Sequence, residues 1–434
     1  MRRVRQLSWF TLIMASLGVL PALGATVPQA PVQWTVDLGV PIYNSPRIRG
    51  NIVYLDSAQS LGPNVFALKN GKVLWRFASL GMIPMAPTLG ASTARADKVK
   101  TMSAMAGRAN MAGIKDMPAK AKGSATMVFV ASDIGDTHFM RALNADTGKW
   151  IWQYTRNKAP QCMCSHSSHY SGGMLFAQTD GHSLYAFKPV GNQAMMAHRI
   201  WQFPGDGTRL TAPVLQDGIV VFASADHKVY AIRASDGTVV WTVSTGYGFV
   251  AAPVIVKNTV IIGNRGGTLH AYRLGNGKSL WSFSANGPIN TTAVARDGMI
   301  YFAAGRGDRG IYALALRTGK QIWNYQMADY TRFAPVLAGN MVLAASRDGN
   351  LVALNATAGQ RIWDRALGGT PFSRPRLDGQ TVVLKVGDHA VRAFNFKTGT
   401  LVWTYENSAV VTAPAVAGSM ICVATSSGLV VALK

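Results

Sequence analysis

The chain has 434 residues, 44 of them glycine, and its 43 Lys and Arg against 20 Asp and Glu give a formal net charge of +23. Hydrophobic residues make up 48% and charged residues 15%, which excludes an intrinsically disordered chain and a coiled coil. Three cysteines are too few for a disulfide-dense scaffold. Glu406 is the only glutamate, so carboxylates are scarce for a chain of this length.

Residues 1–25 have the layout of a secretory signal peptide. Three arginines precede an apolar run of about 14 residues and a stretch of small residues. We expect cleavage after Gly24 or Ala25, which would leave a periplasmic or secreted protein. The first cysteine is Cys162, so we expect no lipid anchor at the cleavage site.

The excess of Lys and Arg over Asp and Glu needs an explanation that fits an exported protein. The arginines are scattered, so a nucleic-acid partner is not expected. Peripheral contact with an anionic membrane surface or cell-wall polymer is one interpretation. Adaptation to an acidic medium is another, which we favour, because a chain with few carboxylates loses little stabilisation when they are protonated.

A repeat of about 40 residues runs through residues 31–434, which we assign to one domain. Its units end in patterns such as 349–363 and 389–403: an alternating strand, a turn with Gly, and a strand with Trp. Segments such as 211–218 and 219–227 supply two more strands upstream, so each unit predicts four short antiparallel strands. The repeated tryptophans are Trp34, Trp75, Trp152, Trp201, Trp241, Trp281, Trp323, Trp363 and Trp403.

Four-stranded units at this spacing predict an all-β propeller. A tryptophan at the same place in every unit indicates packing between neighbouring blades. The turn glycine allows a positive φ.

The repeat is interrupted at about residues 91–126. This insertion holds seven basic and two acidic residues, is rich in Ala, Gly and Met, and has no strand pattern, so we expect a loop. Twelve of the 18 methionines lie between Met82 and Met196.

A second interruption, residues 161–173, concentrates soft metal ligands. Alignment on the repeat places its cysteines and histidines beside the innermost strand. Thiolate and thioether ligands select Cu(I), so one interpretation is a copper site. The alternatives are methionines that fill core gaps and cysteines that are free or joined in a disulfide. The candidate ligands are Cys162, Cys164, His166 and His169. Cys422, in an apolar strand, is expected to be a buried core residue.

The same alignment identifies residues at the start of the innermost strands. Arginines gathered there favour an anionic ligand. The candidate ligand-binding residues are Tyr43, Asn44, Arg209, Asn290, Arg332 and Arg374. Asp206 and Asp329 lie in the preceding loops and are candidate general acids or bases.

The two ends of the chain complete the ring. Residues 412–434 supply three strands but no Trp strand, and residues 33–38 supply a Trp strand with no predecessor. We expect these segments to form one closing blade, since closure removes both sheet edges. This gives nine blades; eight remains the alternative if one unit is displaced.

The pattern Ala-Leu-x-x-x-Thr-Gly-x-x-x-Trp, as in residues 313–323, resembles the repeat of the pyrroloquinoline-quinone (PQQ)-like propeller superfamily. This superfamily includes quinoprotein dehydrogenases, the outer-membrane assembly factor BamB and tetrathionate hydrolases of acidophiles. The resemblance implies eight blades, and we lean slightly to that count. Quinoprotein dehydrogenases carry an adjacent Cys-Cys pair and acidic calcium ligands that this chain lacks, so PQQ is not expected.

Three functions stay open. The first is a BamB-like binding or scaffold protein with a protein partner, at the outer membrane or in the periplasm. The second is a tetrathionate-hydrolase-like enzyme that acts on a small sulfur oxoanion. The third is a copper-binding or redox-associated propeller. We favour the first, because the repeats are nearly regular and no familiar catalytic motif is present.

Overall fold

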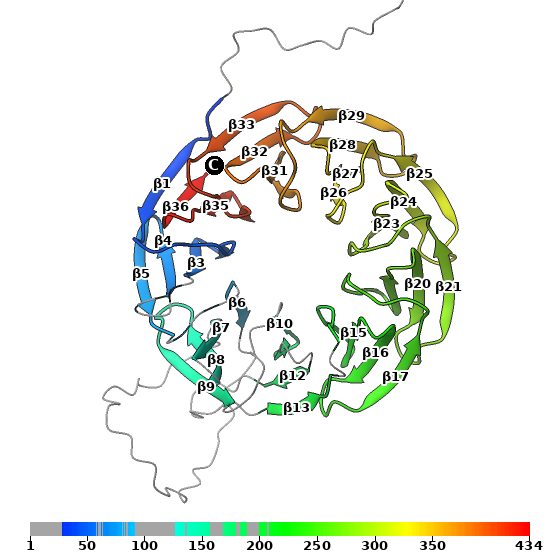
Figure 1. Ribbon diagram of the computed structural model, residues 1–434, viewed down its shortest axis with the longest axis horizontal. Coiled ribbons are helices and arrows are strands. Elements are labelled where there is room, and N and C mark those ends of the chain that lie inside the picture. Colours follow the sequence, from blue (N-terminus) through cyan, green and yellow to red (C-terminus); the bar gives the residue numbers. More distant parts are fainter. Residues whose placement is uncertain are drawn as a thin grey trace, which may run out of the picture.

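The computed structural model describes residues 28–57, 59, 62, 64–79, 81, 83, 86–91, 126–134, 137–156, 168–178, 183–188, 199–205 and 208–434. These residues form 36 strands and no helix, so no helix among them could span a membrane. The strands form nine antiparallel sheets of four. The sheets stand around one axis as the blades of a ring (Figure 1). The predicted all-β propeller is therefore confirmed.

The blades are numbered in chain order. Within each blade the strands are given from the innermost to the outermost. Blade 1 contains β2 (Arg47–Arg49), β3 (Ile52–Asp56), β4 (Val65–Lys69) and β5 (Lys72–Phe77). Blade 2 contains β6 (Thr88–Ala91), β7 (Thr126–Ile134), β8 (Thr137–Asn144) and β9 (Trp150–Arg156). Blade 3 contains β10 (Ser168–Ser171), β11 (Met174–Gln178), β12 (Leu184–Phe187) and β13 (Arg199–Phe203).

The next three blades have strands of matching lengths. Blade 4 contains β14 (Val214–Gln216), β15 (Ile219–Ala223), β16 (Lys228–Arg233) and β17 (Val239–Ser244). Blade 5 contains β18 (Val254–Val256), β19 (Thr259–Gly263), β20 (Thr268–Arg273) and β21 (Ser279–Ser284). Blade 6 contains β22 (Val294–Arg296), β23 (Met299–Ala303), β24 (Gly310–Ala315) and β25 (Gln321–Gln326).

The last three blades include the one that closes the ring. Blade 7 contains β26 (Val336–Ala338), β27 (Met341–Ala345), β28 (Asn350–Asn355) and β29 (Arg361–Ala366). Blade 8 contains β30 (Arg376–Asp378), β31 (Thr381–Val386), β32 (Ala390–Asn395) and β33 (Leu401–Glu406). Blade 9 contains β34 (Ala415–Ala417), β35 (Met420–Ala424), β36 (Leu429–Leu433) and, as its outermost strand, β1 (Val32–Asp37).

Blade 9 joins the two ends of the chain as expected. β1 pairs antiparallel with β36, with Trp34 opposite Ala432. The preceding residues continue onto blade 8, where Ala30 N donates to Thr404 O at 2.9 Å and Thr404 N donates to Pro28 O at 2.9 Å. The ring has nine blades, so the slight preference for the superfamily's eight was wrong. The unpaired strands at the two ends supply the additional blade.

The core consists of nine buried apolar clusters, each drawn from two neighbouring blades. Blades 9 and 1 share one of them, with Cys422 packed beside Val53 and Phe66. Cys422 is fully buried in β35, as the sequence predicted. Because every blade buries both faces against a neighbour, the ring needs no separate hydrophobic core.

The tryptophans pack between blades, as predicted. The Trp323 indole N–H of blade 6 donates to Ala356 O of blade 7 at 2.9 Å, and the equivalent Trp363 donates to Phe396 O of blade 8 at 3.1 Å. Gly359, at φ +73°, lies against the Trp323 ring, where a Cβ atom would stand 2.5 Å from the indole. The recurring geometry of this turn therefore requires glycine both for its positive φ and for its lack of a side chain.

Antiparallel pairing divides the loops between two faces of the ring. One face carries the connections between consecutive blades, such as residues 367–375 and 407–414, and the turns between second and third strands, such as residues 387–389. We call it the connection face. The candidate site lies on this face.

Candidate functional site

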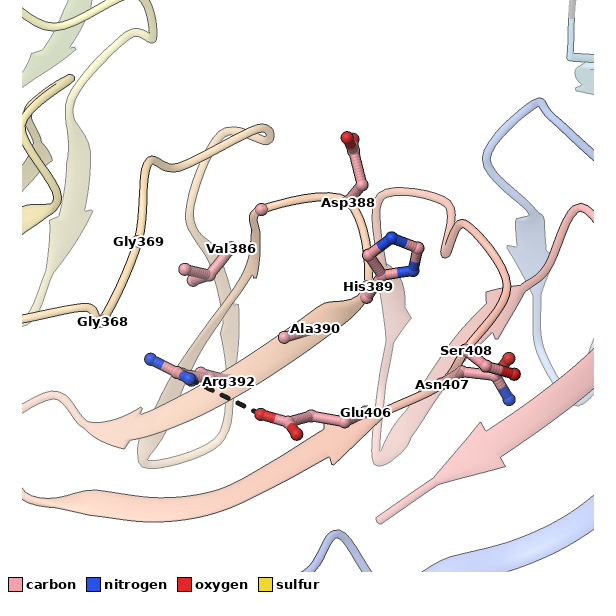
Figure 2. A pocket seen from close by; sticks show the side chains of 11 residues that line it. Gly368, Gly369, Val386, Asp388, His389, Ala390, Arg392, Glu406, Asn407 and Ser408 are labelled. Atoms are coloured by element: carbon pink, nitrogen blue, oxygen red, sulfur yellow. Dashed lines mark ion pairs between the residues drawn. The ribbon is translucent and has the colours of Figure 1, made fainter.

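A pocket of about 530 Å³ opens on the connection face around blade 8 (Figure 2). Three segments form it: the connection from blade 7, the β31–β32 turn with the start of β32, and the end of β33 with its connection to blade 9. Its lining residues are Gly368, Gly369, Val386, Gly387, Asp388, His389, Ala390, Arg392, Glu406, Asn407 and Ser408.

The rim of the pocket is held by backbone hydrogen bonds. Asn407 N donates to His389 O at 3.0 Å, and Val411 N donates to Asp388 O at 2.8 Å. The His389 ring also lies 3.2 Å from Ala409 O through Nδ1. These bonds tie the β31–β32 turn to the connection that leads into blade 9, so the pocket has a preformed wall.

Comparison with blades 4 and 6 shows how blade 8 differs from them at the pocket. Arg392 directly precedes the alanine that pairs with the blade's tryptophan; Tyr230 and Tyr312 hold this position in blades 4 and 6. Each tyrosine hydroxyl donates to an aspartate two residues before its strand begins, Asp226 or Asp308. In blade 8 arginine replaces the tyrosine, so this hydroxyl–carboxylate bond is absent from the turn.

Without that bond, the charged groups of blade 8 are arranged differently. Arg392 donates to Leu367 O, and its Nη2 lies 3.6 Å from Glu406 Oε1. Figure 2 shows these two side chains facing one another, while Asp388 points away from them. Asp388 Oδ1 instead lies 3.6 Å from Lys385 Nζ.

The Arg392–Glu406 pair leaves polar groups available to a ligand. The Glu406 side chain is 61% exposed, whereas Arg392 is largely buried, and its Nε has no hydrogen-bond partner among the described residues. The pocket therefore presents a guanidinium, a carboxylate and the side chains of Asn407 and Ser408 between glycines. This lining suits a polar or charged side chain better than an apolar ligand.

The six predicted ligand-binding residues lie outside this pocket. All occupy connections that lead into innermost strands, on the same face, as the alignment predicted. Tyr43, Arg209, Asn290 and Arg332 are exposed, whereas Asn44 and Arg374 are half-buried. Asn44 donates to Asp56 Oδ2 at 2.6 Å, and Arg374 donates to Pro335 O at 3.1 Å.

Asp329, a candidate general acid or base, lies in a loop between blades and contacts two neighbouring residues. Its carboxylate accepts a hydrogen bond from Tyr330 N at 2.8 Å and lies 3.8 Å from Arg347 Nη1. The other candidate, Asp206, lies outside the described residues.

The predicted copper site falls largely outside the described part of the chain. Cys162, Cys164, His166 and nearly all of the 91–126 insertion lie outside the described residues, as does the segment 1–25 that was predicted to be a signal peptide. His169 is in β10, on the innermost strand of blade 3 as predicted, and burial lowers the pKa of its imidazole. Within the described ranges, no group of three or more His, Cys, Asp or Glu side chains is placed to hold a metal ion.

Sequence reasoning missed Asp56, Arg392 and the pocket role of Glu406. Asp56 ends β3 and is almost fully buried, and burial raises the pKa of its carboxyl to about 7. The signals were present: Glu406 is the only glutamate, Asp56 ends its strand with a carboxylate, and Arg392 stands where blades 4 and 6 have tyrosine.

Comparison with known proteins identifies relatives of the repeat. The family model described as "Outer membrane protein assembly factor BamB" matches residues 137–297, 194–333, 225–371 and 307–434. The assembly factor BamB of Yersinia pestis is 27% identical over 246 residues, which cover 51% of this chain and 60% of that protein. The tetrathionate hydrolase of Acidithiobacillus ferrooxidans is 25% identical over 153 residues, which cover 29% of this chain and 30% of the hydrolase.

Solved structures share the fold. BamB from Moraxella catarrhalis aligns with a TM-score of 0.55 at 17% identity, covering 70% of this chain and 93% of that one. A computationally designed protein, Ika8, aligns with a TM-score of 0.56 at 14% identity, covering 93% of this chain and 99% of the design.

Proposed function

Because this chain belongs to the family of PQQ-like repeat propellers represented by the outer membrane protein assembly factor BamB, we propose that it is a protein-binding propeller that serves outer-membrane protein assembly in the periplasm. The matched relatives named as assembly factors support this role. The chain spans 60% of the Yersinia relative's length, and features of this chain's own surface support the role as well.

The observation that carries the proposal is a set of exposed aromatic side chains on the connection face. Tyr43 is 62% exposed, Tyr247 58% and Phe372 47%, and all three lie in connections between blades. Exposed arginines, Arg209 and Arg332, occupy the same kind of connection. Protein interfaces are enriched in aromatic residues and arginine, and their binding energy is concentrated in such side chains.

The pocket at blade 8 fits the same role. It lies on the connection face beside Phe372, whose ring is 5.7 Å from Lys385 Nζ. A polar side chain of a bound protein could pair with Arg392 or Glu406 while aromatic side chains around it exclude water.

We expect the double variant Tyr43→Ala, Phe372→Ala to bind its partner at least about tenfold more weakly, because truncation of an interface anchor costs ~2 kcal/mol or more. Co-purification after crosslinking in cells, followed by measured affinity for the recovered outer-membrane assembly component, provides the readout. The control is Ile322→Ala with Ile362→Ala, exposed residues on outermost strands. Equal binding by both double variants, or turnover of tetrathionate at acid pH by the purified protein, would overturn the proposal.

The copper site is a separate proposal that the sequence alone supports. We expect the purified protein to hold Cu(I) and the double variant Cys162→Ser, Cys164→Ser to lose it, because thiolates bind this ion far better than hydroxyls. Elemental analysis after reconstitution with Cu(I) measures the stoichiometry. Cys422→Ala is the matched control, since Cys422 is buried in β35. Equal copper content in all three proteins would contradict the site.

A further inference from the structure

Two innermost strands depart from the pattern of the ring. β2 of blade 1 begins with Arg47 and β30 of blade 8 begins with Arg376, whereas the other seven innermost strands begin with uncharged residues. Those seven residues are Thr88, Ser168, Val214, Val254, Val294, Val336 and Ala415. The two arginines are equivalent in register, since each pairs with the third residue of the next strand, Tyr54 or Val383.

These two strands flank the closing blade. β2 and β30 both contact β34, the innermost strand of blade 9. The residue of β34 at the equivalent position is Ala415, whose side chain is only a methyl group. A third arginine, Arg374, lies two residues before Arg376 and is anchored by its bond to Pro335 O.

Arg376 repels both of the other arginines. Burial lowers the pKa of Arg47, and the positive charge of Arg376 lowers it further. Burial and the same Arg376 charge act on Arg374 in that order. Arg376 is therefore the middle of the group, close enough to both neighbours for its charge to act on them.

Nearby carboxyl groups do not neutralise the group. Within the described part of the chain, none of the three arginines has a carboxylate within ion-pair distance. Asp56 attracts Arg47, but its carboxyl is bound to Asn44, and burial raises its pKa. Asp378, two residues beyond Arg376, also has a pKa raised by burial.

We propose that Arg47, Arg374 and Arg376 bind a small oxoanion with two negative charges, in front of Ala415 at the connection-face end of the innermost strands. Guanidinium groups bind such oxygens through paired N–H donors, and a dianion would offset the repulsion between Arg376 and the other two arginines. Ala415 leaves room for the anion between the two flanking strands. The proposal goes beyond the proposed function, because it concerns a small ligand and not a protein partner.

Sulfate is the probe, titrated calorimetrically and in thermal unfolding against chloride at equal ionic strength. We expect one sulfate per chain, with a rise in Tm that chloride does not reproduce. Arg376→Gln should weaken sulfate binding at least tenfold and should leave the ligand-free Tm unchanged or higher, because it relieves repulsion. Arg376→Lys keeps the charge but loses the paired donors. Its affinity for sulfate should therefore lie between those of Arg376→Gln and the unaltered protein.

The control is Arg296→Gln on β22, an innermost-strand arginine that donates to Gly339 O at 2.6 Å. It should bind sulfate as the unaltered protein does. Equal sulfate affinity in Arg376→Gln and the unaltered protein, or a sulfate effect no larger than that of chloride, would overturn the proposal. Partner binding through Tyr43 and Phe372 is measured separately, so the two proposals fail independently.

Discussion

Replacing Asp56 with Asn should remove a fall in stability that the unaltered protein shows between about pH 4 and pH 7. Burial raises the pKa of this carboxyl from 3.8 to about 7 in the folded chain, partly offset by the hydrogen bond from Asn44 and the charge of Arg47. The folded protein then holds a proton that the unfolded chain has already released. The stabilisation from this proton is complete below pH 3.8 and is lost as the pH rises through 7.

The size of this effect is bounded by the pKa difference. A shift of three units corresponds to at most roughly 4 kcal/mol in the free energy of unfolding. Asp56→Asn cannot ionise, so it should match the unaltered protein near pH 4 and exceed it at pH 8 by an amount up to that bound. Urea unfolding at pH 4, 6 and 8 measures the difference, with Asp217→Asn in an exposed turn as control. Parallel stability profiles for Asp56→Asn and the unaltered protein would contradict the assignment.

Trp323→Ala should lower the free energy of unfolding by about 3–5 kcal/mol, the range for truncation of a large buried aromatic side chain. Trp323 is only 7% exposed, lies in the cluster between blades 6 and 7, and satisfies Ala356 O through its indole N–H. The variant loses this packing and leaves a buried carbonyl without its donor.

Trp150→Ala is the matched control, because Trp150 is 38% exposed on β9, and its loss should cost less than about 1 kcal/mol. Denaturant unfolding gives the free energies, and hydrogen exchange should show the loss of protection centred on blades 6 and 7. Similar destabilisation by both substitutions would mean that the tryptophans packed between blades do not contribute more to the stability of the ring than exposed ones.

The sequence predicts the fold well because the same pattern of strands, turn glycine and tryptophan recurs from unit to unit. Trp363, for example, lies 40 residues after Trp323 and makes the same bond to the following blade. The pairing of residues 33–38 with the C-terminal strands also follows from counting strands. The blade number was harder to predict, because the expectation from the superfamily competed with that count.

The candidate site could be predicted only in part. The alignment placed Tyr43 and Arg374 in the connections that lead into innermost strands, since position in the repeat fixes position in the ring. It could not show that Arg392 stands where Tyr230 and Tyr312 bond an aspartate, because that contrast needs the strand register. It also could not show that Asp56 is buried, since an aspartate that ends a strand usually faces solvent.

The seam of the ring has a consequence for how the protein reaches its folded state. Blade 9 takes β1 from residues 32–37 and its other strands from residues 415–433, and residues 28–30 continue across the seam onto β33. These two segments, which are far apart in the sequence, must therefore meet before the last interfaces form. During synthesis the other blades can assemble in order, while this final step requires residues 415–433. Arg47 and Arg376 come together only at that step, so an anion bound between them would stabilise the ring after it has closed.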